Sequence, residues 1–478
     1  MTWQTIPEMV LSAGDRFGDS EAVVDGSRRL TFREITDRIL RAAGAFHRFG
    51  IVKGDRVAIW APNSADWIIA AFGLLTAGAT LVPINTRYKQ AEADDILVRS
   101  SARLLLVQKG FLGQDFTPST TVPVIDLSSG FLDDGEPFQA ELDGTDIADV
   151  MFTSGTTGRP KGVMTNHRQT LRLFSEWCDL ADLRTGDRYL IVNPFFHMFG
   201  YKAGMIAAFI RGATIYPVPV FDVDAVLTIV ADEQITMLPG PPTLYQSLLS
   251  ADRSTWDLSS LRAAVTGSAD IPVELIRRMH EELPFETIMT GYGLSEGGTV
   301  TASRRGDTFE QIAATVGTPC ADIEIAIADD GEVLIRGYNV MQGYLDDPDA
   351  TAEAIDPAGW LHTGDLGAFD DDGHLRIIGR KKDMFIVGGF NAYPAEIESY
   401  LLDHPAVAQV AVIGVPDERL GQVGKAFVVA AAEVTEDEIL DFARERMAGF
   451  KAPRSVVFLD ELPLTATGKV HKDLLRRR

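Results

Sequence analysis

The chain has 478 residues, more than the roughly 100–150 residues of a typical single domain, so we expect two or more domains. Hydrophobic residues make up 46% and charged residues 23%, values typical of folded globular proteins and not of disordered ones. A net charge of −24 disfavours binding to nucleic acid and to anionic membranes, because both repel an acidic protein.

The cysteine content and the first residues bear on the compartment. Cys178 and Cys320 are the only cysteines, and they lack the CxxC spacing of a metal or redox site. The opening residues lack the basic segment and long apolar core of a secretion signal. We therefore expect a soluble, cytoplasmic protein whose mature chain begins near Met1.

Apolar strand-like runs alternate with helical patterns through about the first 300 residues. The run 56–62 (RVAIWAP) precedes a helical pattern, and the run 102–108 (ARLLLVQ) follows another. Such alternation is typical of βαβ units with largely parallel sheets. The main body is therefore predicted to be α/β.

The segment 67–84 (WIIAAFGLLTAGATLVPI) carries no charge and is long enough to suggest a membrane span. However, it contains glycine, threonine and proline, and it changes midway from helix formers to strand formers. We interpret it as a buried helix that turns at Gly78 into a buried strand, Ala79 to Pro83. No membrane insertion is expected.

The stretch 153–162 (TSGTTGRPKG) directly follows the apolar run 150–152 (VMF). Its glycines let the backbone turn tightly and aim N–H groups inward, its hydroxyls add donors, and Lys161 adds a positive charge. This chemistry suits phosphate groups. On composition alone a flexible surface turn is favoured, and the spacing of a Walker A loop is absent.

A change of pattern marks the later part of the chain. From about Gly317 onward, short alternating runs are separated by DDG turns, which indicate β-hairpins. After 379–383 (GRKKD) come helix, strand and helix patterns that are independent of the preceding ones. We place the boundary between an N-terminal domain, 1–380, and a C-terminal domain, 381–478.

The stretch TSGTTGRPKG resembles the signature loop of the adenylate-forming acyl- and aryl-CoA ligases, the ANL superfamily of AMP-binding enzymes that includes luciferases and peptide-synthetase adenylation domains. Further motifs follow in that family's order and extend the resemblance over essentially the whole chain: NPFFH (193–197), GYGLSE (291–296), WLHTGD (360–365), GRKKDMFIVGGFNAYPAEIE (379–398) and LTATGK (464–469). Six motifs in one order make the resemblance highly specific.

The resemblance implies a fold and a reaction. The N-terminal domain would hold two βαβ subdomains and a β-barrel-like subdomain, and a small mobile α+β C-terminal domain would turn at a hinge near Lys382. The activity would be that of an AMP-forming acid–thiol ligase. A carboxylate would attack the α-phosphorus of ATP with loss of pyrophosphate, and the thiol of coenzyme A would then displace AMP. ATP, Mg²⁺ and coenzyme A would be required.

The family motifs also imply residue roles in the nucleotide site. The signature loop with Lys161 would hold the β and γ phosphates, Glu296 would bind Mg²⁺, and Asp365 would accept hydrogen bonds from the ribose hydroxyls. Ser295, where the family more often has threonine, keeps the hydroxyl that contacts the α-phosphate. The nucleotide and coenzyme A candidates are Thr153, Ser154, Gly155, Thr156, Thr157, Gly158, Lys161, Gly267, Ser268, Ala269, Gly291, Tyr292, Gly293, Ser295, Asp365, Arg380, Lys382, Gly388 and Gly389.

Catalytic and acyl-binding roles follow from the same resemblance. Lys469 would bridge the acid's carboxylate and the α-phosphate, although the preceding PLTAT differs from the usual Pro-Arg-Thr and leaves one phosphate contact open. The catalytic candidates are Lys469, Glu296 and His197, and the acyl-site candidates are His197, Met198, Phe199, Lys202, Gly293 and Leu294. We hypothesise that Lys202 meets a ketone oxygen on a compact cyclic acid, the alternative being a solvated helix lysine.

The acceptor and the acid leave alternatives open. The resemblance implies that the segment 388–390 (GGF) swings against the main body for the second step, where its glycines would let a pantetheine arm pass close to the backbone. Coenzyme A is the simplest acceptor. A free-standing enzyme that loads a carrier protein and a non-catalytic nucleotide sensor are the rivals. The stretches 193–204 and 238–249 resemble actinobacterial ligases that act on propionate side chains of degraded steroid rings, whereas medium-chain fatty acids and aryl acids are alternatives. A homodimer is our working expectation for the assembly.

Overall fold

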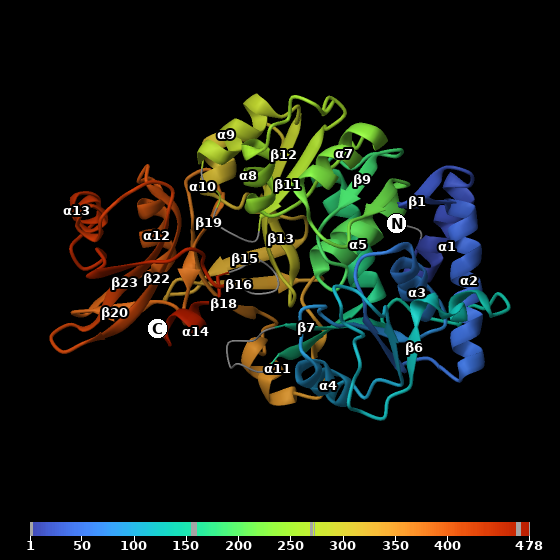
Figure 1. Cartoon of the computed structure of the whole chain (residues 1–478). Helices are drawn as coiled ribbons and strands as arrows, with labels where there is room; N and C mark the ends of the chain where they lie inside the picture. The colour runs from blue at the N-terminus through green and yellow to red at the C-terminus, as the bar shows by residue number, and fades with distance from the viewer. Residues whose placement is uncertain (1–2, 154–159, 268–270, 272, 465–469, 478) are drawn as a thin grey trace.

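The computed structural model describes residues 3–153, 160–267, 271, 273–464 and 470–477. It shows a large body, blue to gold in Figure 1, and a smaller unit at the C-terminal end, orange to red at the left of that view. The body is α/β and the small unit is α+β. The predicted fold class is therefore confirmed.

One sheet of the body has the strand order β17-β8-β7-β4-β3-β5-β6. From β7 to β6 the neighbours pair in parallel, whereas β8 and β17 run antiparallel to their neighbours. The strands are β3 (Arg56–Trp60), β4 (Thr80–Pro83), β5 (Leu104–Val107), β6 (Val124–Asp126), β7 (Ile147–Thr153), β8 (Lys161–Asn166) and β17 (Gly343–Tyr344). The helices α3 (Ala65–Thr76) and α4 (Gln90–Arg99) connect parallel strands, which confirms the predicted βαβ units.

The uncharged segment 67–84 folds as the sequence predicts. Helix α3 begins after Ser64, whose hydroxyl accepts a hydrogen bond from the Trp67 N–H at 3.1 Å. Gly78 then turns the chain with φ +91°, a left-handed conformation that favours glycine, and β4 follows. Within the ranges that the structure describes, no helix is both long and apolar enough to cross a bilayer.

A second layer joins two smaller sheets, β2-β1-β10-β9 and β11-β12-β13-β14. Met237 connects them, because it pairs in parallel with Tyr189 on one side and with Ala263 on the other. The strands are β1 (Glu21–Asp25), β2 (Arg28–Thr31), β9 (Arg188–Ile191), β10 (Thr214–Pro217), β11 (Ala263–Gly267), β12 (Thr287–Leu294), β13 (Gly298–Ala302) and β14 (Thr318–Pro319). The helices at the top of this layer in Figure 1 are α7 (Val223–Glu233), α8 (Pro242–Ser250), α9 (Val273–Glu282) and α10 (Phe309–Ala314).

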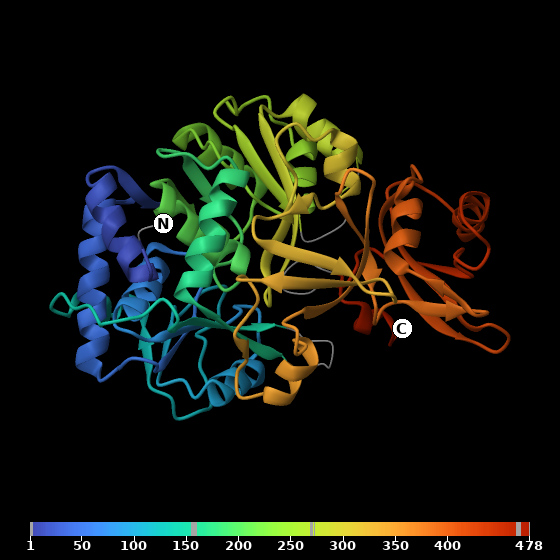
Figure 2. The ribbon, with the colours of Figure 1, turned by 180° about the vertical axis from the view of Figure 1, so that it is seen from behind.

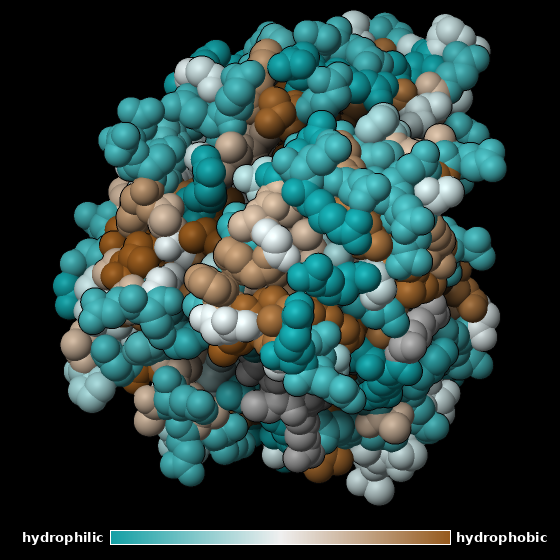
Figure 3. Space-filling model, turned by 90° about the vertical axis from the view of Figure 1, so that its left-hand side faces the viewer, coloured by the Kyte–Doolittle hydropathy of each residue, from teal (hydrophilic) through white to brown (hydrophobic). Residues whose placement is uncertain are grey.

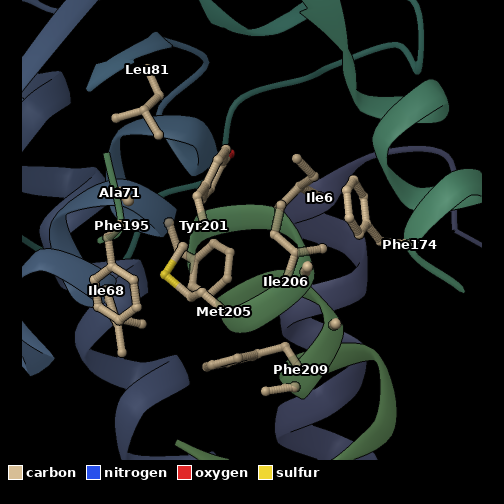
Figure 4. Close-up of a cluster of buried hydrophobic side chains, with 14 of the residues drawn as sticks. Ile6, Ile68, Ala71, Leu81, Phe174, Phe195, Tyr201, Met205, Ile206 and Phe209 are labelled. Atoms are coloured by element: carbon tan, nitrogen blue, oxygen red, sulfur yellow. The ribbon is translucent and has the colours of Figure 1, made fainter. Parts of the chain in front are cut away.

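The main hydrophobic core lies among helices of the body. These are α1 (Ile6–Phe17), α2 (Phe32–Phe49), α3, α5 (His167–Leu180), the π-helix η3 (Phe199–Ile206) and α6 (Ala207–Arg211). Figure 4 shows Ile6, Ile68, Phe174, Met205 and Phe209 in one buried cluster, although they come from five different helices. Because these side chains are fully or almost fully buried, the cluster fixes η3 against the other helices.

An antiparallel sheet with the order β15-β16-β18-β19 follows. Its strands are β15 (Ile323–Ile327), β16 (Glu332–Gly337), β18 (Leu361–Phe369) and β19 (Leu375–Arg380), and α11 (Pro348–Ala354) lies between β17 and β18 in the chain. Gly331 and Gly373 have positive φ in the two DDG turns, which confirms the predicted hairpins. Figure 2 shows this sheet between the α/β body and the C-terminal unit.

The C-terminal unit has a sheet of its own, ordered β21-β20-β23-β22, with β24 added beside β23. Its elements are β20 (Phe385–Val387), β21 (Phe390–Ala392), α12 (Pro394–Leu402), β22 (Val407–Asp417), β23 (Gly421–Ala430), α13 (Glu436–Arg446), β24 (Ser455–Phe458) and α14 (Lys472–Leu475). Its buried clusters contain only residues from 385 onward. Seen from this end, the surface is largely hydrophilic with hydrophobic patches between polar side chains (Figure 3).

Candidate active site

A buried carboxylate, Asp365, forms the centre of one part of the site. Asp365 lies on β18 opposite Arg380 of β19, and the Arg380 Nε atom is 2.9 Å from Asp365 Oδ1. From β12, the hydroxyl of Tyr292 donates a hydrogen bond to Asp365 Oδ2 at 2.5 Å. Three strands of two different sheets therefore bring together three residues predicted for the nucleotide site.

The surroundings of the Tyr292 hydroxyl keep it protonated. Burial, and then the negative charge of Asp365, raise the pKa of Tyr292 well above its ordinary value, so the hydroxyl remains a donor. A carboxylate has about four lone-pair positions. Tyr292 and Arg380 each occupy one oxygen without exhausting it, which leaves Asp365 able to accept further hydrogen bonds, such as those of a ribose.

The strands on either side of the signature loop are described by the structure. Thr153 at the end of β7 lies directly opposite Lys161 at the start of β8. The Lys161 Nζ atom is 4.9 Å from the centroid of the Tyr344 ring, a distance typical of a cation–π contact. The ends of the predicted phosphate loop are thus held together by a β-ladder.

Glu296 lies in the turn between β12 and β13. Its Oε1 atom accepts a hydrogen bond from the Tyr344 hydroxyl at 3.0 Å, and its backbone carbonyl accepts one from the Met341 N–H at 2.7 Å. Tyr344 therefore contacts both Glu296 and Lys161, two residues that the sequence assigns to the metal and to the phosphates.

The NPFFH stretch is positioned by an asparagine from another part of the chain. The Asn63 side chain accepts a hydrogen bond from the Phe195 N–H at 2.7 Å and donates one to the Asn193 carbonyl at 3.0 Å. A Cβ atom at Gly200 would lie 2.3 Å from the Pro194 carbonyl oxygen. The tight approach of η3 to this loop therefore requires glycine at position 200.

Three of the acyl-site candidates, His197, Met198 and Phe199, lie where η3 begins. His197 Nδ1 accepts a hydrogen bond from the Phe199 N–H at 3.2 Å, so a neutral ring carries its proton on Nε2. Met198 and Phe199 are partly buried against the main core. π-Helices are rare in proteins, and those that occur are often found at functional sites. The π-helical form of η3 therefore agrees with a binding role for this segment.

Lys202 is not a solvated helix residue, and that alternative was wrong. The residue is 3% exposed, its Nζ atom lies 2.9 Å from Asp149 Oδ1, and it donates a hydrogen bond to Thr165 Oγ1 at 2.6 Å. The lysine could not be placed from local periodicity, because its partners lie on β7 and β8. The contact with a substrate ketone stays a prediction.

Closely packed glycines line the path from β11 to the β12–β13 turn. Gly267 pairs with Gly291 in the parallel ladder, and a Cβ atom at Gly291 would lie 2.6 Å from the Thr301 carbonyl oxygen. A Cβ atom at Gly293 would lie 2.5 Å from the Gly298 carbonyl oxygen. The main chains therefore approach closely along this edge, next to the partly buried Leu294 and Ser295.

The candidates of the C-terminal unit lie in two turns. Lys382 is exposed in a turn that is closed by the N–H groups of Asp383 and Met384, both of which donate to the Arg380 carbonyl. Gly388 and Gly389 form the two-residue connection of the β20–β21 hairpin, with φ +57° and +90°. Positive φ at both positions suits a type I′ turn, so this glycine pair has a structural reason of its own.

Several predicted residues lie outside the part of the chain that the structure describes. They are Ser154, Gly155, Thr156, Thr157, Gly158, Ser268, Ala269 and Lys469. Their predicted roles at the phosphates and at the reacting carboxylate stay predictions.

Several residues that contact predicted site residues were not identified from the sequence, among them Tyr344, Asn63 and Asp149. Each acts across a long separation in the chain; Tyr344, for example, is 48 residues from Glu296. No short motif carries that information. The one usable signal was that Asp149 interrupts an otherwise apolar strand before the signature loop, since a buried carboxylate requires a partner.

Comparison with known proteins agrees with this arrangement. Residues 11–345 match the model of the AMP-binding enzyme family, and residues 396–469 match that of the AMP-binding enzyme C-terminal domain. A 3-[(3aS,4S,7aS)-7a-methyl-1,5-dioxo-octahydro-1H-inden-4-yl]propanoyl:CoA ligase of Rhodococcus jostii (strain RHA1) is 48% identical, and one of Mycobacterium tuberculosis (strain ATCC 25618 / H37Rv) is 47% identical. Both alignments cover 99% of this chain and 98% of the relative.

A solved structure gives the same result for the fold. The o-succinylbenzoate CoA synthetase MenE from Bacillus subtilis, in complex with its acyl-adenylate intermediate, superposes with a TM-score of 0.89 at 29% identity. The superposition covers 98% of both chains.

These matches define a class of protein. The chain belongs to the AMP-binding enzyme family, as its motifs predicted. It is an AMP-forming acid–thiol ligase that uses ATP and coenzyme A to convert a carboxylic acid into a thioester by way of an acyl-adenylate.

Proposed function

We propose that this ligase activates the propanoate side chain of a compact bicyclic keto acid, of the kind formed when steroid rings are degraded. The acid would carry a methyl-substituted, fused five- and six-membered ring system with ketone groups.

The identity of 47–48% over essentially the full length to two ligases named for such an acid carries this proposal. The chemistry of the site supports it. A fully apolar acyl pocket would suit a fatty acid tail, whereas Lys202 introduces a cation near the acyl-site candidates. An ammonium has three donors, and the contacts with Asp149 and Thr165 use two of them.

We assign the nucleotide to the contacts around Asp365 and Lys161. Asp365 would accept from the ribose hydroxyls, Arg380 would hold Asp365, and Tyr292 would lie beside the adenine. Lys161, with the signature loop, would hold the β and γ phosphates. Positioned cations and N–H donors are the groups that stabilise a transferring phosphoryl centre, and they would stabilise the charge that collects around the α-phosphorus.

The residues present fit a magnesium ion that is shared with ATP. Mg²⁺ is usually held by one or two carboxylates together with substrate phosphates, and Glu296 is a carboxylate close to the lysine of the phosphate loop. Among the residues placed by the structure, no group of three or more His, Cys, Asp or Glu side chains could hold a metal on its own. The ion would neutralise phosphate charge, while Tyr344 orients Glu296.

The reaction would proceed in two steps, adenylate formation and thioester formation. One oxygen of the acid's carboxylate bonds to the α-phosphorus as the bond to pyrophosphate breaks, with Lys469 beside the reacting atoms and His197 at the entrance for the carboxylate. The sulfur of coenzyme A, after loss of its proton, then bonds to the acyl carbon as AMP leaves with its electron pair. The C-terminal unit would turn near Lys382 between the steps.

A panel of acids tests the substrate. We expect coenzyme A-dependent AMP release with the highest kcat/KM for 3-(7a-methyl-1,5-dioxo-octahydroinden-4-yl)propanoate, and lower values for the same ring system without ketones, for octanoate and for benzoate. A preference for octanoate or for an aryl acid would assign the enzyme to one of the alternative classes instead.

The acceptor of the acyl group can be tested directly. An enzyme that loads a carrier would acylate a phosphopantetheinylated carrier and would not turn over with free coenzyme A. We place the protein in the cytoplasm, which agrees with the unpaired state of Cys178 and Cys320. Light scattering after size-exclusion chromatography would test the homodimer.

A further inference from the structure

The segment 339–345 connects two parts of the active site that are distant in sequence. On one side, its backbone is bonded to β8: the Gln342 N–H donates to the Met164 carbonyl at 2.9 Å, and the Leu345 N–H donates to the Gly162 carbonyl at 2.8 Å. The segment is therefore fixed to the strand that begins with Lys161.

On its other side, the same segment holds the turn that carries Glu296. The Met341 N–H donates to the Glu296 carbonyl at 2.7 Å, and the Asn339 side chain donates to the Gly297 carbonyl, also at 2.7 Å. Asn339 is 3% exposed, so this contact is shielded from water. The segment thus fixes the backbone of the β12–β13 turn relative to β8.

Within this segment, Tyr344 connects the two sides through its side chain. Its hydroxyl donates to Glu296 Oε1 at 3.0 Å, and its ring centroid is 4.9 Å from Lys161 Nζ. One side chain therefore contacts a site carboxylate and a site cation together.

The backbone of Tyr344 is itself held in place. Its N–H donates to the Thr351 hydroxyl of α11 at 2.9 Å, and its strand pairs with β8. The preceding Gly343 has φ +134°, which a side chain would strain, and a Cβ atom there would lie 3.0 Å from Thr351 Cγ2. The position of the Tyr344 ring is thus determined by contacts on both sides of the backbone.

We propose that Tyr344 is a positioning residue for the nucleotide–metal site, which orients the Glu296 carboxylate toward the ion and places the Lys161 ammonium for the phosphates. The inference rests on the proposed assignment of Mg²⁺ to Glu296. Partners that bind a metal-ligating carboxylate typically contribute about 10- to 100-fold to metal affinity. Tyr344 lies in that position relative to Glu296.

The two contacts of Tyr344 can be separated by substitution. Tyr344→Phe keeps the ring next to Lys161 and removes only the hydrogen bond to Glu296. Tyr344→Leu removes both contacts. We expect Tyr344→Phe to weaken metal binding only. Tyr344→Leu should weaken metal binding and also the binding of ATP, measured in the absence of a divalent ion.

The test uses the full-length enzyme with ATP, and Mn²⁺ as the probe ion. Free Mn²⁺ is measured by electron paramagnetic resonance, so that the readout does not depend on turnover. For Tyr344→Phe we expect about tenfold weaker Mn²⁺ binding to the enzyme–ATP complex. Thioester formation from a supplied acyl-adenylate and coenzyme A should stay within about twofold of the wild-type rate, since that step needs no pyrophosphate leaving group.

Tyr338 offers a matched control. Its hydroxyl donates to Glu176 at 3.5 Å and its ring lies 3.7 Å from the Arg172 guanidinium carbon, so it also joins a carboxylate and a cation. None of these three residues is assigned to the active site. Tyr338→Phe makes the same chemical change and should leave Mn²⁺ binding unchanged.

The outcomes separate this inference from the assignment on which it rests. Weaker Mn²⁺ binding in Glu296→Gln and in Tyr344→Phe, with normal binding in Tyr338→Phe, supports the proposal. Normal binding in Tyr344→Phe, when Glu296→Gln binds weakly, overturns the role of Tyr344 alone. Normal Mn²⁺ binding in Glu296→Gln overturns both the metal assignment and the role of Tyr344. Equal losses of Mn²⁺ binding in Tyr344→Phe and Tyr338→Phe overturn the positioning role.

Discussion

Lys202 and Asp149 form an ion pair of 2.9 Å in which the lysine and aspartate side chains are only 4% and 0% exposed. The pair joins η3, which carries acyl-site candidates, to β7, which ends at Thr153 in the predicted phosphate loop. A buried charge that loses its partner is strongly destabilising, because its desolvation is no longer compensated. The segments predicted to bind the acid and the phosphates are thus connected through the interior.

Lys202→Met should therefore destabilise the protein. We expect the free energy of unfolding, measured by urea titration with a fluorescence signal from the body, to fall by about 3–5 kcal/mol. Lys53→Met is the control, because the Lys53–Asp146 pair is exposed to 49% and 26%. That change should cost less than about 1 kcal/mol, and a similar loss in both variants would contradict the importance of burial.

The substrate role of Lys202 needs a variant without a stranded charge. Lys202→Met/Asp149→Leu removes both charges together. If the third donor of Lys202 reaches a ketone of the acid, kcat/KM for the keto acid should fall about tenfold relative to that for its ketone-free analogue. An unchanged ratio between the two acids would leave Lys202 with a structural role only.

The stability of the body should depend on pH through His167. Burial lowers the pKa of His167 to about 4 in the folded protein, below the ordinary value of 6.5. Between pH 6.5 and pH 4 the unfolded state therefore binds more protons than the folded state. The contribution of His167 to stability is fully present above pH 6.5 and is lost as the pH falls toward 4.

We expect His167 to account for about 2 kcal/mol of the stability lost between pH 7 and pH 5. His167→Gln should reduce this pH dependence in urea titrations, whereas His280→Gln, at an exposed position of α9, should not. Parallel pH profiles for the wild type and His167→Gln would show that other groups determine the acid sensitivity.

Lys382→Pro tests the hinge. Proline restricts φ to about −65° and disfavours helical backbone in the residue before it, so a turn that must change conformation would be locked. We expect adenylate formation, followed by pyrophosphate exchange into ATP, to persist while thioester formation stalls. Lys382→Ala should retain both half-reactions, and an equal loss of both in the proline variant would contradict the hinge assignment.

Lys469→Ala should affect the other half-reaction, the formation of the adenylate. Loss of a positioned charge-stabilising group should slow adenylate formation by about 10²- to 10³-fold. Conversion of a supplied acyl-adenylate to thioester should continue near the wild-type rate. Acetylation of Lys469 should act like the mutation because it removes the same charge. Full pyrophosphate exchange in the alanine variant would exclude the assigned role.

Local signals were sufficient for most of the fold. The alternation of apolar runs with helical patterns predicted the parallel strands β3, β4 and β5, and the change from helix formers to strand formers at Gly78 predicted where α3 gives way to β4. The DDG turns predicted two hairpins. In each case the determining residues lie within a few positions of one another.

The connections inside the site were not predictable in this way. Lysine is rarely buried without a partner, so Lys202 was compatible with a solvated position until Asp149 and Thr165 were found beside it. Likewise, Tyr344 contacts Glu296 only because β17 pairs with β8. Periodicity reports which face of an element is buried, but it does not report which distant element covers that face.

The separate hydrophobic clusters on the two sides of residues 380–384 have a practical consequence for engineering. The largest cluster of the body runs from Ile6 to Leu375, and those of the C-terminal unit begin at Phe385, so none of the buried clusters described extends across the turn. A backbone cut there would leave each hydrophobic interior intact. The unit could accordingly be exchanged between homologous ligases, and such hybrids should inherit their choice of acid from the donor of the larger piece.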